Sequence, residues 1–131
     1  MSRVLYLDSS AIVKLAVAEP ESEALRRYLR RRKPYLSSAL ARTEVARALL
    51  PFGAEAVRRG VEVLSRIDLV RVNDTVLQAA GALLPEELRT LDAIHLATAG
   101  QLGHDLARVV TYDERMTATA KAIGFKVIAP A

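Results

Sequence analysis

The first strong indication of the fold is the stretch of residues 4–15, which reads VLYLDSSAIVKL. The apolar run at residues 4–7 is typical of a short buried β-strand. Ser9 and Ser10 follow it, and either can cap a helix that we expect over residues 11–17. Asp8 therefore lies at the carboxyl end of a strand, where the chain turns into a helix.

The rest of the chain repeats this alternation of short apolar runs and helical segments. We expect further strands at residues 35–37, 69–72, 108–112 and 125–128, and helices at 21–31, 39–50, 54–66, 75–84, 90–102 and 114–123. Strands separated by helices run largely parallel, with helices on both faces of the sheet. With no internal repeat or linker, residues 1–131 are predicted to form a single α/β domain, a three-layer α/β/α fold around a largely parallel sheet of about five strands.

The composition of the chain excludes several classes of protein and of functional site. A chain of 131 residues, 51% of them hydrophobic, is long enough to bury a core. The absence of cysteine excludes disulfides and thiolate metal sites. The glycines form no phosphate-binding loop motif, so a nucleotide cofactor is not indicated. No run is long enough to span a bilayer and the start lacks a signal pattern, so we expect a cytoplasmic protein without membrane contact.

Four acidic residues stand where a folded chain has little structural use for them. Asp8 and Asp113 each follow an apolar run, Asp92 interrupts an apolar helical segment, and Glu44 lies in the helix expected over residues 39–50. Side chains at the carboxyl ends of parallel strands face the crevice where ligands bind. Two carboxylates about 4 Å apart repel by roughly 4 kcal/mol at an effective dielectric near 20. A shared cation would relieve that repulsion, and oxygen ligands favour Mg²⁺ or Mn²⁺ over Zn²⁺.

Each acid also has a structural explanation. Asp8 could cap the following helix, although two serines are available for that purpose. Asp113 could cap the helix at 114–123, and its neighbour Glu114 competes for the same role. Glu44 could pair with Arg47 three residues on. Asp92 is the hardest to explain structurally, because an unpaired carboxylate among apolar groups is costly unless it binds a cation.

Other polar side chains are expected to play smaller parts. Thr111 lies two residues before Asp113, on the same side of the predicted strand, and could hold a water at the site. Ser9 could form a hydrogen bond there. His95 follows Asp92 by one helical turn, and we expect it to be hydrogen-bonded within the packing rather than a ligand.

Basic residues are concentrated despite a net charge of only +4. Residues 26–33 contain five arginines and a lysine, and within this stretch we consider Arg30 and Arg31 as candidate RNA contacts. The alternative is that these side chains form the solvated face of a helix.

Four segments resemble the motifs of PIN-domain ribonucleases, in the order that this family shows. They are residues 6–15 (YLDSSAIVKL), 42–45 (RTEV), 91–99 (LDAIHLATA) and 111–116 (TYDERM). The resemblance spans essentially the whole chain, whose length is similar to that of the VapC toxins of toxin–antitoxin pairs.

The resemblance implies a metal-dependent endoribonuclease. Asp8, Glu44, Asp92 and Asp113 would be its acidic quartet, with Asp8, Asp92 and Asp113 binding Mg²⁺ or Mn²⁺ and Thr111 as an accessory group. A metal-activated water would then hydrolyse an RNA phosphodiester bond. The resemblance further implies a homodimer and a cognate VapB-type antitoxin that blocks the site.

Two other functions remain open. A phosphate-accepting receiver domain also carries acids beyond its strands, but it would need paired acids after the first strand, where Ser9 and Ser10 stand. A PIN-like module that binds RNA or protein without catalysis is the other alternative. A metal-dependent nuclease assay separates that module from an enzyme.

Overall fold

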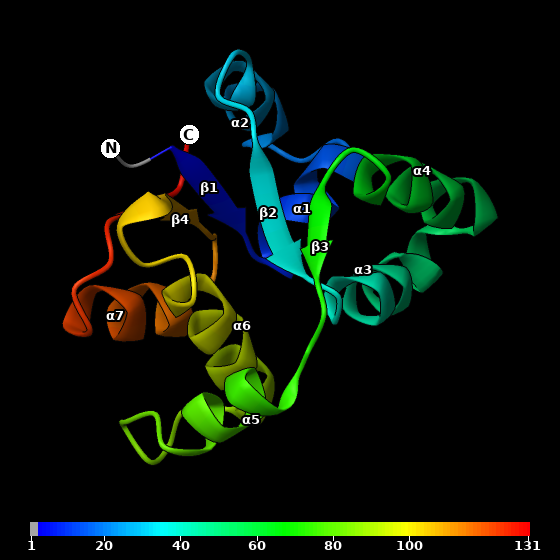
Figure 1. Ribbon diagram of the computed structural model, residues 1–131. Helices are drawn as coiled ribbons and strands as arrows, with labels where there is room; N and C mark the ends of the chain where they lie inside the picture. The colour runs from blue at the N-terminus through cyan, green and yellow to red at the C-terminus, as the bar shows by residue number, and fades with distance from the viewer. Residues whose placement is uncertain (1–2) are drawn as a thin grey trace.

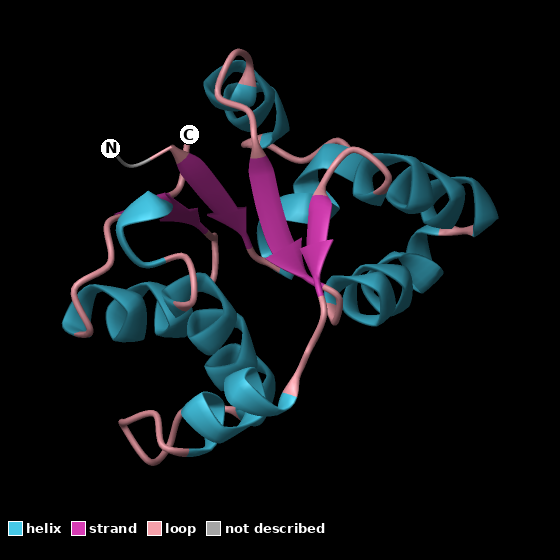
Figure 2. Cartoon of the chain, viewed as in Figure 1, coloured by secondary structure: helices cyan, strands magenta, loops and turns pink. Residues whose placement is uncertain are grey.

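The central element is a parallel five-stranded sheet. The computed structural model describes residues 3–131, and its strands run in the order β3-β2-β1-β4-β5 (Figures 1 and 2). The strands are β1 (Val4–Leu7), β2 (Tyr35–Ser38), β3 (Asp68–Val70), β4 (Leu106–Val110) and β5 (Val127–Ile128). All neighbouring pairs are parallel. The sequence-based prediction of a largely parallel sheet of about five strands is confirmed.

Helices cover both faces of this sheet. One face carries α1 (Ser9–Ala16), α2 (Ser22–Leu29), α3 (Ala41–Leu49) and α4 (Ala54–Leu64), and the other carries α5 (Asp74–Gly81), α6 (Thr90–Gly100) and α7 (Glu114–Ala122). Two short 3₁₀ turns, Leu50–Phe52 and Gly103–Asp105, complete the described elements. The predicted three-layer arrangement is therefore also confirmed.

The alternation of side chains along β1 divides the core between the two faces. Leu5 and Leu7 pack with α1 to α4, whereas Tyr6 between them packs with Ala99 of α6 on the other side. The side chains of Leu5, Tyr6 and Leu7 are almost completely buried. A central strand that is buried on both faces is the reason for the continuous apolar run in the sequence.

Close packing of α3 against α4 depends on a glycine. A Cβ atom at Gly60 would lie 2.6 Å from Cδ1 of Leu49 and 3.3 Å from Cγ1 of Val45. The absence of a side chain thus lets the two helices approach, which fixes α3 and the acidic residue that it carries.

Several predicted boundaries were wrong by one to three residues. The strand predicted at residues 108–112 is β4, Leu106–Val110, because pairing with β1 begins at Leu106. Thr111 therefore lies beyond the strand and not within it. The serines do not cap the first helix, since Asp8 is its N-cap and accepts a hydrogen bond from the backbone N–H of Ala11.

Among the residues that the structure describes, no helix is both long and apolar enough to cross a membrane.

Candidate functional site

Asp8 lies at the carboxyl edge of the sheet, immediately after β1. Its backbone N–H donates to the carbonyl oxygen of Val110, which extends the pairing of β1 and β4 up to this residue. The side chain is only 3% exposed. Burial raises the pKa of Asp8, although hydrogen bonds from Ser10, Thr111 and the backbone of Ala11 oppose this effect.

Hydroxyl groups hold the two carboxylate oxygens of Asp8. Ser10 Oγ donates to Oδ1 at 2.6 Å, and Thr111 Oγ1 donates to Oδ2. Ser10 Oγ also accepts from the backbone N–H of Tyr112 at 2.9 Å. The segment after β4 is thus tied to the start of α1, and Thr111 reaches the site from a loop.

Asp113 is positioned by the same loop. Its backbone N–H donates to Thr111 Oγ1 at 3.1 Å, and its carboxylate accepts from the backbone N–H of Met116 at 2.9 Å as the N-cap of α7. The sequence left Asp113 and Glu114 as rivals for this cap. The structure assigns the cap to Asp113, and Glu114 is exposed as the first residue of the helix.

Asp92 lies in the first turn of α6. Burial raises the pKa of Asp92, and the negative charge of Asp113 raises it further, with a smaller contribution from Asp8. Within residues 3–131 none of these three carboxylates forms an ion pair. Asp92 is therefore within electrostatic reach of both Asp113 and Asp8, and no ion pair of the described residues neutralises any of the three.

Glu44 joins the site through a histidine. His95 Nε2 lies 2.6 Å from Glu44 Oε1, and Nδ1 of the same ring lies 2.6 Å from the hydroxyl of Tyr6. Ser9 Oγ donates to Glu44 Oε1 at 2.6 Å. Burial acts to raise the pKa of Glu44, but the hydrogen bond and charge of His95, together with Ser9, outweigh it and lower the pKa. The pairing of Glu44 with Arg47 that the spacing allowed is not formed.

A small cavity opens beside Asp92. It has a volume of about 240 Å³ and is lined by Asp92, by Arg89 just before α6, and by Arg115 of α7. The positive charge of Arg89 lowers the pKa of Asp92 in part. These two arginines were not identified from the sequence, although both stand within three residues of a candidate acid.

The comparisons with known proteins agree on one family. The sequence profile of the PIN domain matches residues 5–122. This chain belongs to the PIN-domain family. Ribonuclease VapC46 of Mycobacterium tuberculosis (strain ATCC 25618 / H37Rv) is 65% identical over 126 residues, which cover 96% of this chain and 97% of that protein. Ribonuclease VapC35 of M. tuberculosis (strain CDC 1551 / Oshkosh) is 38% identical over 131 residues, with 97% of each chain covered.

Solved structures show the same fold. The crystal structure of M. tuberculosis VapC20, a toxin that cleaves the sarcin–ricin loop, superposes with a TM-score of 0.75 at 18% identity and covers 96% of this chain and 99% of that one. A chain of a toxin–antitoxin complex from Klebsiella pneumoniae gives a TM-score of 0.73 at 22% identity, with 97% and 98% covered. The predicted PIN-like fold is thereby confirmed.

The side chains of this PIN domain can be tested for their fit to a metal ion. Within residues 3–131 no three acidic or histidine side chains stand in an arrangement that would hold a metal ion without movement. The donor set nevertheless fits Mg²⁺ or Mn²⁺, because Asp8, Asp92 and Asp113 supply only oxygen atoms and two of them have raised pKa values. The metal role of the three stays a prediction.

Arg30 and Arg31 do not lie near these acids. They follow α2 and precede β2, so they lie at the amino edge of the parallel sheet, and both are exposed. The acids occupy the carboxyl edge. Any contact of these arginines with RNA is therefore separate from the acidic site.

Proposed function

We propose that this PIN domain is a Mg²⁺- or Mn²⁺-dependent endoribonuclease and the toxin of a type II toxin–antitoxin pair. The proposal rests on the positions of three aspartates that no ion pair neutralises among the described residues. Asp8 and Asp113 follow β1 and β4 at the carboxyl edge of the sheet, and Asp92 experiences the negative charge of both. The relatives named VapC, of which one shares 65% identity over nearly the full length, support ribonuclease activity. The fold similarity to a chain of a toxin–antitoxin complex is consistent with an antitoxin as partner. The proposal includes a VapB-type antitoxin, a homodimeric state and a cytoplasmic location.

Asp8, Asp92 and Asp113 would hold the divalent ion. When bound, such an ion neutralises charge on a phosphate and lowers the pKa of water, so that hydroxide forms near neutral pH. Ser10 and Thr111 fix the carboxylate of Asp8, and the backbone N–H of Met116 holds one oxygen of Asp113. Thr111 is in this account a positioning residue, because its contact is with Asp8.

Glu44 completes the acidic quartet by holding His95. The carboxylate binds Nε2 of the ring while the buried hydroxyl of Tyr6 occupies Nδ1, so the imidazole is fixed at both nitrogens. Ser9 fixes the same carboxylate oxygen. No hydrogen bond of the described residues involves Oε2 of Glu44, and this atom is free to orient a water or an RNA hydroxyl.

Arg89 and Arg115 would place the RNA backbone. Both line the cavity beside Asp92, and guanidinium groups match the geometry of phosphate oxygens. Positive charge at this position counters the repulsion between the RNA and the three aspartates. The arrangement thus supports hydrolysis of a phosphodiester, for which positioning and electrostatic stabilisation are the main requirements.

A cleavage assay on a pool of RNA tests the proposal. Wild-type protein with Mn²⁺ should cut RNA, Asp92→Asn should not, and the control Asp74→Asn should cut as wild type does. Asp74 is an exposed acid at the start of α5, outside the site. Equal cleavage by wild type and Asp92→Asn would show that the site is misplaced. An inactive wild type would instead favour the binding module without catalysis.

A further inference from the structure

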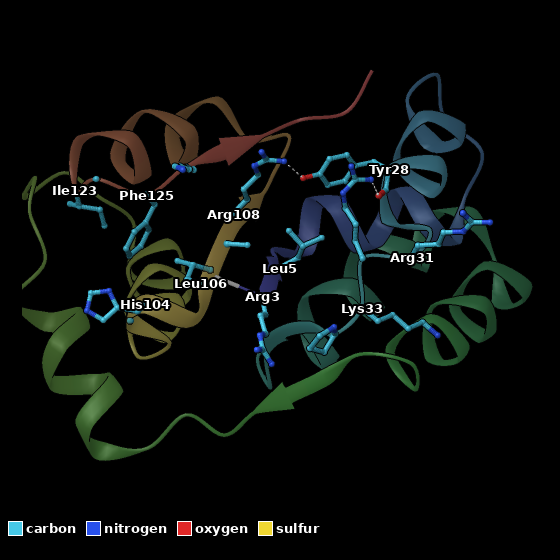
Figure 3. A pocket seen from close by; sticks show the side chains of 16 residues that line it. Arg3, Leu5, Tyr28, Arg31, Lys33, His104, Leu106, Arg108, Ile123 and Phe125 are labelled. Carbon is cyan, nitrogen blue, oxygen red and sulfur yellow. Dashed lines mark hydrogen bonds between the residues drawn. The ribbon is translucent and has the colours of Figure 1, made fainter. Parts of the chain in front are cut away.

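A second concavity lies at the opposite edge of the sheet. It has a volume of about 1010 Å³ and is surrounded by the amino ends of β1, β2, β4 and β5 (Figure 3). Asp8 and Asp113 of the proposed catalytic site follow the carboxyl ends of β1 and β4. Because all strands are parallel, the length of the sheet, roughly 15 Å for strands of this size, separates the two sites.

Positive charge dominates the lining of this concavity. Six cationic side chains contribute, and all of them are exposed: Arg3, Arg31, Arg32, Lys33, Arg108 and Lys126. No aspartate or glutamate is among the lining residues of the described chain. Within residues 3–131 none of the six forms an ion pair. Their charges are therefore available to an anion from solution.

Two of these guanidinium groups are held in place by a tyrosine. Arg108 Nη1 donates to the hydroxyl of Tyr28 at 2.7 Å (Figure 3). The guanidinium carbon of Arg32 lies 4.2 Å from the centre of the Tyr28 ring. Arg32 also donates to the backbone carbonyl of Tyr28. A fixed cation loses less conformational freedom when it binds an anion than a mobile one does. The concavity is therefore partly preorganised.

We infer that this basic concavity binds the phosphodiester backbone of RNA, apart from the acidic site. The inference rests on the proposed ribonuclease function for the identity of the polyanion. The cations are distributed around a wide concavity and do not converge on one point, which suits a chain of phosphates better than a single small anion. Arginine predominates, and its planar donors match phosphate oxygens. An acidic protein segment is the competing occupant.

RNA that occupies both sites must be long or folded enough to pass from one edge of the sheet to the other. The concavity would then select substrates by their shape around the cleavage point, without reading bases there. Its contribution should appear in binding and not in the chemical step.

Fluorescence anisotropy with a labelled single-stranded RNA of about 20 nucleotides, longer than a site of roughly 4–16 nucleotides, tests this inference. Binding is measured in EDTA, so that cleavage plays no part. The test variant is Arg31→Gln/Lys126→Gln, because neither side chain forms a hydrogen bond or an ion pair within the described chain. The matched control is Arg26→Gln/Arg66→Gln, which removes two exposed and unpaired charges outside the concavity.

The test variant should lower the slope of log Kd against log salt by about 1.4, since each phosphate contact to a single strand contributes about 0.7. Between 50 and 200 mM salt, wild type should accordingly lose about sevenfold more affinity than the test variant. The control should keep the wild-type slope.

The inference would be overturned if wild type and the test variant had equal slopes. It would also be overturned if both double variants lowered the slope equally. Poly-L-glutamate, added at the same charge concentration as the RNA, tests the competing occupant. If it displaced RNA from wild type and from the control but not from the test variant, the concavity would instead be assigned to an acidic protein. A failure of the proposed function is distinguishable, because an inactive protein would still show the predicted difference in slope.

Discussion

The two edges of one sheet carry opposite charges in opposite environments. At the carboxyl edge, Asp8 is buried and its oxygens accept hydrogen bonds from neighbouring hydroxyls. At the amino edge, Arg31 and Lys126 are exposed and make no ion pair among the described residues. A fixed, desolvated carboxylate is suited to hold a cation at one point, whereas solvated cations are suited to attract a polyanion over a surface. Substitutions at the two edges should therefore fail in different ways.

The largest effect is expected at the carboxyl edge. Asp92→Asn and Asp113→Asn should each lower kcat for RNA cleavage by at least about 100-fold, because the amide keeps the shape but removes charge needed to hold the metal ion. Single-turnover cleavage with saturating RNA measures this effect. If either variant changed only KM and not kcat, the carboxyl edge would not differ from the amino edge in the way described.

Glu44→Gln should reduce kcat less, by about 10- to 100-fold, as expected for a group that orients others at a metal site. The amide can still accept from Ser9, but its charge no longer stabilises His95. The pH profile of kcat should also shift, since Glu44 and His95 act as a pair. An unchanged profile with reduced kcat would indicate a purely structural role.

Stability should depend on the hydrogen bond to the buried histidine. Tyr6→Phe leaves His95 Nδ1 without its partner and should lower the free energy of unfolding by about 1–3 kcal/mol. Tyr28→Phe at the amino edge breaks an exposed bond to Arg108 and should stay within about 0.5 kcal/mol of wild type. Urea denaturation of both variants makes the comparison. Similar losses would mean that the two edges do not differ in burial as described.

The smallest effect is expected in the pH dependence of the stability of the metal-free protein. The pKa of Asp92 is raised in the folded state, so its contribution to stability is complete below the unfolded value of about 4 and is lost as pH rises through the folded value. Asp92→Asn has no ionisable carboxyl at this position, so it does not lose stability in this way as pH rises. In EDTA, the Tm of this variant should therefore decline less than that of wild type between about pH 4 and 7. A parallel decline would contradict the electrostatic account.

The acids at the carboxyl edge could be predicted from the sequence because two of them follow the ends of strands. Asp8 and Asp113 come directly after apolar runs, so parallel topology alone placed them at one edge. The sequence could not separate capping from ligand binding, since both need a carboxylate at the start of a helix. Asp8 and Asp113 do cap α1 and α7.

Contacts that depend on exact strand ends or on distant segments are harder to predict from the sequence. Thr111 was placed in a strand, but β4 ends at Val110 and the hydroxyl reaches Asp8 from a loop. The Tyr6–His95 bond joins residues 89 positions apart, on elements that no local pattern relates. The basic concavity is assembled from several separate segments, of which only the stretch containing Arg31 stood out as a charge cluster.

Binding of Mn²⁺ tests the central claim most directly, because it separates metal binding from catalysis. Calorimetric titration of metal-free protein should show Mn²⁺ binding to wild type and to the control Asp74→Asn. The same titration should show no Mn²⁺ binding by Asp8→Asn or Asp92→Asn. Adding Mn²⁺ should restore RNA cleavage only to the proteins that bind the ion. Undiminished cleavage of RNA by wild type in EDTA, with no Mn²⁺ binding in the titration, would contradict the account.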